Sequence, residues 1–165
     1  MTNRKQWLKA GRLTCLGASI LLFAISLMVP AYLFGWTEKN PYGRPSSWTY
    51  GYAALGLGWL GLLIGQFGWL ANLPVIVGWV ALALKKRMLA LFSGASAFLL
   101  SLDTIRLFYM EWRSEAHQPP RTLEQLGPGF YLWTMSMLVV VMGAVMCGGS
   151  DLNQGENAST RGRNR

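Results

Sequence analysis

The feature that most constrains the fold is an uncharged stretch from Pro45 to Leu84. These forty residues hold no Asp, Glu, Lys or Arg, and Lys85, Lys86 and Arg87 follow directly. A water-soluble domain needs charge on its surface, and charged residues usually make up about a quarter of such domains. In this chain of 165 residues they make up 13%, whereas 52% of the residues are hydrophobic. We therefore interpret the stretch as membrane-embedded, with the rest of the chain supplying its partner helices.

Four apolar segments predict an all-α bundle of four transmembrane helices, in which the lipid bilayer is the solvent. At about 1.5 Å per residue, each segment reaches or nearly reaches across a hydrocarbon layer of roughly 30 Å. The four spans are expected at about residues 13–34, 53–84, 88–109 and 129–147. Together they form one membrane domain at 13–147, with a basic lead at 1–12 and a disordered tail at 148–165. In the last of the loops, Thr122 and Gln125 fit a capping box, which predicts a single helical turn.

The distribution of basic residues predicts the orientation of the chain. Ten of the fifteen Lys and Arg residues lie on the side of the termini: four before the first span, three at 85–87 and three in the tail. Four lie in the loops on the opposite side. Lys and Arg collect on the cytoplasmic side of membrane proteins, so both termini are expected in the cytoplasm. The short loops indicate a bacterial inner-membrane protein. We therefore interpret the net charge of +8 as a consequence of membrane orientation and not as a sign of nucleic-acid binding.

The second span is too long for one straight helix across the membrane. As a continuous helix, residues 51–84 would extend about 51 Å, so the span must tilt, protrude or break. Pro74 predicts a kink there, because proline lacks the N–H of a helical hydrogen bond. Small residues recur at spacings of three and four, which would place them on one helical face. This glycine seam, expected to contact a protein partner or a second copy, comprises Gly51, Ala54, Gly58, Gly61, Gly65 and Gly68.

Four polar residues within the apolar segments are the candidate functional residues. Asp103 and Arg106 are three residues apart and so lie on one helical face. They form either a proton or ion relay, or a substrate contact, or a structural salt bridge that fixes helix register. Arg106 or Gln66 is expected to be the partner of Asp103. Asn72, beside the kink, either bonds to a neighbouring helix or belongs to a broken, substrate-binding helix.

The sequence favours binding over catalysis. The apolar spans contain no Ser-His-Asp set, Cys-x-x-Cys motif or paired carboxylates, and no metal or cofactor site is predicted. The first hypothesis is therefore an interaction protein that is not an enzyme: an accessory subunit of a membrane complex, or an immunity-type protein. It would act through helix–helix contacts or through its periplasmic face. The alternative is an oligomeric transporter or channel for a small solute or ion, which would use Asp103 and Arg106.

Overall fold

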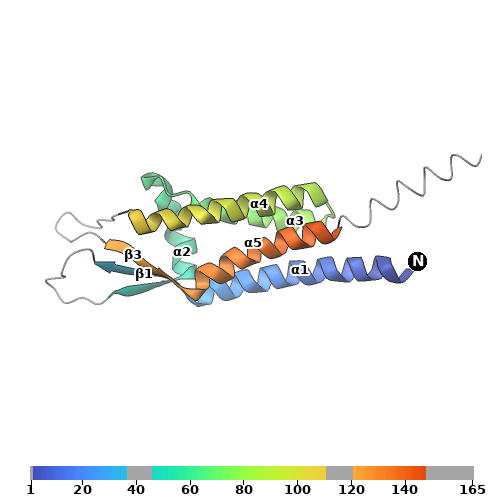
Figure 1. Ribbon diagram of the computed structural model, residues 1–165, viewed down its shortest axis with the longest axis horizontal. Helices are drawn as coiled ribbons and strands as arrows, with labels where there is room; N and C mark the ends of the chain where they lie inside the picture. Colours follow the sequence, from blue (N-terminus) through green and yellow to red (C-terminus); the bar gives the residue numbers. More distant parts are fainter. Residues whose placement is uncertain (1, 37–45, 111–120, 148–165) are drawn as a thin grey trace, which may run out of the picture.

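The computed structural model describes residues 2–36, 46–110 and 121–147, and the tail predicted at 148–165 lies outside them. The described chain is mostly helical (Figure 1). Its α-helices are α1 Thr2–Met28, α2 Gly51–Leu57, α3 Asn72–Ala83, α4 Arg87–Leu102 and α5 Pro128–Cys147. Three segments are 3₁₀-helical: η1 Gly58–Ile64, η2 Gly68–Ala71 and η3 Asp103–Tyr109. The strands are β1 Pro30–Trp36, β2 Ser47–Tyr50 and β3 Arg121–Leu126.

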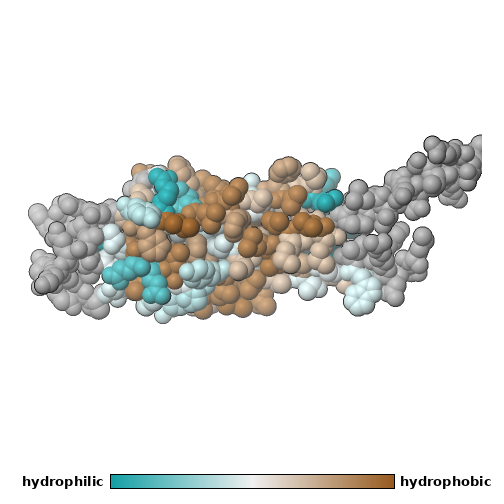
Figure 2. Space-filling model, viewed as in Figure 1, coloured by the Kyte–Doolittle hydropathy of each residue, from teal (hydrophilic) through white to brown (hydrophobic). Residues whose placement is uncertain are grey.

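Three helical segments are long and apolar enough to cross a membrane, which makes this a possible multi-pass membrane protein. They are Ala10–Met28, Arg87–Tyr109 and Pro128–Met146. Figure 2 shows hydrophobic residues over most of the middle of the visible face, with hydrophilic residues nearer the ends. Large apolar side chains are exposed along these helices, among them Leu21, Phe92 and Met142. Such surface is suited to lipid rather than to water.

The helices pack as an elongated bundle. In Figure 1, α1 and α5 lie side by side, α3 and α4 lie above them, and α1 begins at the end where α5 stops. Alanines and a few larger side chains fill the centre, including Leu82, Met137 and Val140. One polar chain crosses this core: Trp79 Nε1 donates to Ser19 Oγ at 2.8 Å, and Ser19 Oγ donates to the Ser136 carbonyl at 2.7 Å. These bonds tie three helices together.

The other end of the bundle carries a three-stranded antiparallel sheet that the sequence did not predict. The strand order is β2-β1-β3, with Leu33 opposite Trp48 and Phe34 opposite Leu123. The predicted first span to residue 34 is wrong, because α1 ends at Met28 and β1 begins at Pro30. Proline disfavours helical conformation in the residue before it. The helical turn predicted around Leu123 is also wrong, because pairing with β1 overrides the local capping signal.

The predicted second span is too broken to be one of the three segments that could cross a membrane, and its break comes earlier than the sequence predicts. The predicted kink at Pro74 is wrong: α3 runs through it from Asn72 to Ala83. Pro74 is the third residue of α3, where a helical N–H has no partner within the helix, so its absence costs little. The break lies instead at residues 65–67, between η1 and η2. Gly65 adopts φ 77° and ψ 21°, a left-handed conformation that glycine reaches without steric cost.

Candidate functional site

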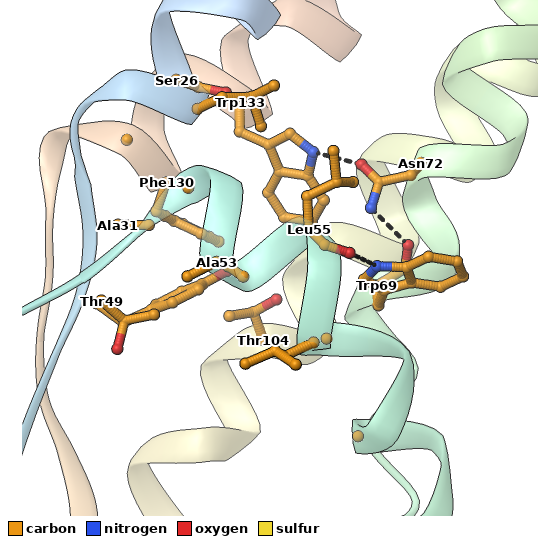
Figure 3. Close-up of a pocket in the computed structure, with 18 of the residues that line it drawn as sticks. Ser26, Ala31, Thr49, Ala53, Leu55, Trp69, Asn72, Thr104, Phe130 and Trp133 are labelled. Atoms are coloured by element: carbon orange, nitrogen blue, oxygen red, sulfur yellow. Dashed lines mark hydrogen bonds between the residues drawn. The ribbon is translucent and has the colours of Figure 1, made fainter.

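A cavity of about 270 Å³ lies where the sheet meets the helices (Figure 3). Its wall is drawn from the end of α1, from β1 and β2, from α2 and η1, and from the start of α5. None of the described residues that line it carries a charge. Six aromatic side chains contribute to it: Phe23, Tyr32, Phe34, Trp69, Phe130 and Trp133. A concave, aromatic and uncharged wall is typical of sites for small apolar ligands.

Asn72 joins the two tryptophans of the wall. Trp133 Nε1 donates to Asn72 Oδ1 at 2.9 Å, and Asn72 Nδ2 donates to the Trp69 carbonyl at 2.8 Å (Figure 3). Trp69 Nε1 donates in turn to the Leu55 carbonyl at 2.8 Å. The amide of Asn72 thus bonds to the neighbouring helix α5, which is one of the two roles considered for it. These bonds satisfy both indole N–H groups and fix the shape of the wall.

Gln66 lies in the break between η1 and η2 and lines the cavity. It is 8% exposed, and its backbone N–H donates to the Gly61 carbonyl at 2.9 Å. Its side-chain amide makes no hydrogen bond to another residue in the described part of the chain. A Cβ at Gly61 would lie 2.7 Å from Gln66 Oε1, and one at Gly68 would collide with Nε2. The Gln66 side chain therefore lies close to both glycines and forms part of the cavity wall.

Tyr32 and Thr104 keep the cavity uncharged. Tyr32 projects from β1, and its hydroxyl is hydrogen-bonded to the side chain of Thr104 in η3. Burial raises the pKa of Tyr32 from 10.0 to about 12, although the bond to Thr104 acts in the opposite direction. The phenol therefore stays protonated throughout the physiological range. A charged ligand would have to leave water without gaining a counter-ion here, so the cavity favours neutral molecules.

Asp103 and Arg106 are paired as the sequence suggests, but they do not line the cavity. Arg106 Nη1 lies 3.0 Å from Asp103 Oδ1, with 60% of the Arg106 side chain and 17% of the Asp103 side chain exposed. The other carboxylate oxygen, Oδ2, accepts the backbone N–H of Phe67 at 2.6 Å. Gln66, the second partner considered for Asp103, is not bonded to it. The carboxylate therefore accepts a hydrogen bond from the break between η1 and η2, a role that the sequence did not reveal.

The glycine seam does not form the single helical face that its spacing predicts, because the segment changes from α to 3₁₀ and then breaks. Its members make room for this chain's own atoms instead. A Cβ at Gly51 would strike the end of α1, one at Gly58 the ring of Trp69, and one at Gly68 the side chain of Thr104. Ala54 lines the cavity, whereas a Cβ at Gly65 would meet nothing within 4 Å.

Sequence reasoning singled out part of the cavity wall and missed the rest. Gln66 and Asn72 both line the cavity, and so do Gly51, Ala54, Gly58 and Gly61 of the glycine seam. Lys85 and Lys86 lie in the turn between α3 and α4 and Arg87 begins α4, at the opposite end of the bundle from the sheet (Figure 1). Tyr32, Thr104 and Trp133 were missed because they come from separate elements with no shared motif. No family model, curated protein or solved structure matches this chain, so its own geometry carries the assignment of function.

Proposed function

We propose that the protein is a small multi-pass protein of a bacterial inner membrane that acts by binding and not by catalysis. The cavity at the junction of sheet and helices is its ligand site. The observation that carries this proposal is an aromatic cavity whose described lining residues carry no charge and include the buried Gln66. Its volume of about 270 Å³ is near the lower end of the roughly 300–1,000 Å³ usual for ligand pockets. It therefore takes a small molecule or one end of a longer lipid.

The groups in the wall support binding rather than reaction. Nucleophilic catalysis needs a hydroxyl or thiol beside a general base. The hydroxyl of Ser26 instead donates to the Phe23 carbonyl at 2.6 Å, and the Tyr32 hydroxyl is held by Thr104. The remaining polar groups are the Thr49 hydroxyl, amides and indoles, and none of them acts as a general base near neutral pH.

The proposed threading has four crossings, the second made by the short α3, and both termini in the cytoplasm. The sheet and the cavity then face the periplasm, close to the outer surface of the bilayer. A ligand site on that side would suit the role of an accessory subunit of a membrane complex, or that of an immunity-type protein. Assembly through the glycine seam has weaker support, because most seam positions contact this chain itself.

The alternative of an oligomeric transporter or channel has less support. A proton or ion relay through Asp103 needs a carboxylate that faces the path of the transported species. The Asp103 carboxylate is instead bonded to the Phe67 N–H and to Arg106. Neither Asp103 nor Arg106 lines the cavity. A liposome flux that depended on the Asp103 carboxylate would restore this alternative.

The test fills the cavity and measures photolabelling. Ala54 lines the cavity from α2, whereas Gly56 on the same helix does not, and a Cβ there would meet nothing within 4 Å. The full-length protein in nanodiscs is photolabelled with dodecane that carries a diazirine, and labelled peptides are mapped by mass spectrometry. We expect Ala54→Leu to reduce labelling of the cavity wall several-fold, because the new side chain occupies the space.

Gly56→Leu is the matched control and should leave labelling of the wall unchanged. If Ala54→Leu and the wild type were labelled alike, or if label appeared only on lipid-facing positions of α1, the cavity would not be a ligand site.

A further inference from the structure

We infer that the end of the bundle opposite the sheet binds the phosphate of an anionic phospholipid. The headgroup site comprises four basic residues: Arg12, Lys85, Lys86 and Arg87. It is separate from the cavity and does not depend on the ligand proposed there. The level of these residues in the bundle, their unsatisfied donors, the balance of charge around them and the backbone at one of them each support the inference.

The packing around Gly143 places the headgroup site at one level of the bundle. A Cβ on Gly143 of α5 would lie 3.0 Å from Cys15 of α1 and 3.3 Å from Leu82 of α3. Arg12 comes three residues before Cys15, and Lys85 comes three residues after Leu82. Because α1 runs toward the sheet and α3 runs away from it (Figure 1), both steps lead to the same end of the bundle, each by about 4.5 Å. One headgroup can therefore meet side chains from both segments.

Two of the four side chains have an unsatisfied donor. The Nε atoms of Arg12 and Arg87 are buried, and neither has a hydrogen-bond partner in the described part of the chain. A polar group that leaves water without a partner is costly, and more so when it is charged. Both residues are only partly buried as a whole, so their guanidinium groups stay within reach of a ligand. Phosphate oxygens are the acceptors that suit several guanidinium donors at once.

The charge of the headgroup site is not balanced by a carboxylate in the described ranges. The acidic residues there are Asp103 and Glu124, in η3 and β3, toward the sheet. Lys86 and Arg87 also stand at the start of α4, whose first turn holds no acidic residue. The start of a helix favours an anion and disfavours a cation. A bound anion would therefore be stabilised by the basic side chains and would relieve their mutual repulsion.

Lys85 holds its charge at a backbone position that suits glycine better. Its φ of 60° lies in the left-handed region, and it is the one residue other than glycine with positive φ in the described chain. Backbone bonds close the turn, because Lys85 N–H donates to the Leu82 carbonyl at 3.2 Å and Lys86 N–H donates to the Ala81 carbonyl at 2.8 Å. The exposed Lys85 side chain is not needed for these bonds, so its charge is free to serve a ligand.

A lipid headgroup is the anion that a membrane supplies at this level. Phosphatidylglycerol carries a net negative charge, whereas phosphatidylcholine adds a quaternary ammonium that would meet four cations. Each Lys or Arg near an anionic lipid surface favours binding by about five-fold. The site is therefore expected to select anionic over zwitterionic phospholipids.

The test measures lipid retention by native mass spectrometry. The full-length protein in a neutral detergent is mixed with equal amounts of dioleoylphosphatidylglycerol and dioleoylphosphatidylcholine. We expect the phosphatidylglycerol complex to exceed the phosphatidylcholine complex by about ten-fold, and equal retention would overturn the inference. Displacement of the lipid by the same concentration of inorganic phosphate, or of a short DNA duplex, would also overturn it, because the site would then recognise free phosphate or nucleic acid.

The basic residues are tested with Arg12→Gln and Arg87→Gln. Each should lower the preference for phosphatidylglycerol by about five-fold, because one cation is removed. Arg106→Gln is the matched control: it removes the same charge near the sheet, far from the headgroup site, and should keep the full preference. A preference that survived both test variants, or that fell equally in the control, would overturn the assignment.

Lys85→Gly separates binding from folding. Glycine reaches the left-handed backbone without steric cost, so the thermal midpoint should not fall. The preference for phosphatidylglycerol should nevertheless fall by about five-fold, since the charge is lost. A merely structural lysine would give the opposite result, a lower midpoint with the lipid preference intact, and that outcome would overturn the inference. This variant gives an answer even if the arginine variants fail to fold.

Discussion

At the scale of single residues, Asp103 became a candidate because of its charge, but its carboxylate hydrogen-bonds a backbone N–H. Asp103 was a candidate because ionised residues in apolar segments are costly and are often functional. In the structure its carboxylate accepts the N–H of Phe67, a group that the break at residues 65–67 removes from any helix. Its bond to the exposed Arg106 is secondary. The free-energy cost of an ionised side chain in an apolar segment is offset by its hydrogen bond to the Phe67 N–H, which no helix satisfies.

This assignment predicts unequal effects of two alanine substitutions. Asp103→Ala should lower the free energy of unfolding by about 1–2 kcal/mol, because the Phe67 N–H loses a charged acceptor at 2.6 Å. Arg106→Ala should cost below about 1 kcal/mol, since a solvent-exposed ion pair contributes little. Chemical unfolding in detergent measures both values, and hydrogen exchange at Phe67 should accelerate only in Asp103→Ala. Equal losses would show that the ion pair is the stabilising contact.

At the scale of elements, the predicted second span departs most from a regular helix. A sharp turn at Gly65 separates η1 from η2, and the irregular backbone that follows lines the cavity through Gln66. Non-helical backbone at membrane depth is tolerated where protein or a polar cavity surrounds it. The break is therefore where the chain bends Gln66 into the site.

Gly65→Ala tests the conformation at this turn. The left-handed backbone at Gly65 should make the substitution cost about 1–2 kcal/mol of unfolding free energy, although its Cβ would meet no neighbour. Gly56→Ala is the matched control in open space on α2, where alanine should stabilise the helix by about 0.5–1 kcal/mol. Thermal unfolding followed by circular dichroism compares the two. A stabilising Gly65→Ala would mean that the turn is not left-handed in the membrane.

The elements that the sequence predicts well are those whose signal is local. α5 covers Pro128–Cys147 where a span is predicted at 129–147, because an apolar run of that length has few other folds. The strands β1 and β3 could not be predicted in the same way, since each depends on pairing with residues about ninety positions away. The same holds for the site. Gln66 and Asn72 are conspicuous in an apolar run, whereas Tyr32 and Trp133 join them only through the packing of α5 and the sheet.

At the scale of the whole molecule, the two ends of the bundle differ in chemistry. One end carries the start of α1, the end of α5 and the basic residues 85–87, and the other carries the sheet (Figure 1). The asymmetry of Lys and Arg predicts that the basic end is cytoplasmic. This orientation decides which compartment reaches the cavity.

Site-directed labelling tests the orientation. In a background without native cysteines, Ser46→Cys at the sheet end should react with a membrane-impermeant maleimide added to spheroplasts. Lys85→Cys in the α3–α4 turn should react only after the membrane is permeabilised. Ser46 and Lys85 are both exposed, so accessibility of the side chain does not limit either reaction. The reverse pattern would place the termini and the basic turn on the outside and overturn the proposed threading.

The bond between Ser19 and the Ser136 carbonyl has a consequence for biosynthesis. It joins positions 117 residues apart, so the first helix leaves the ribosome long before its main packing partner exists. At about 5–20 residues per second, that interval is roughly 6–23 s. During this time the Ser19 hydroxyl and its apolar neighbours face lipid or a helper protein of the insertion machinery. The packing of α1 is therefore complete only after α5, the last helix of the described chain, has been synthesised.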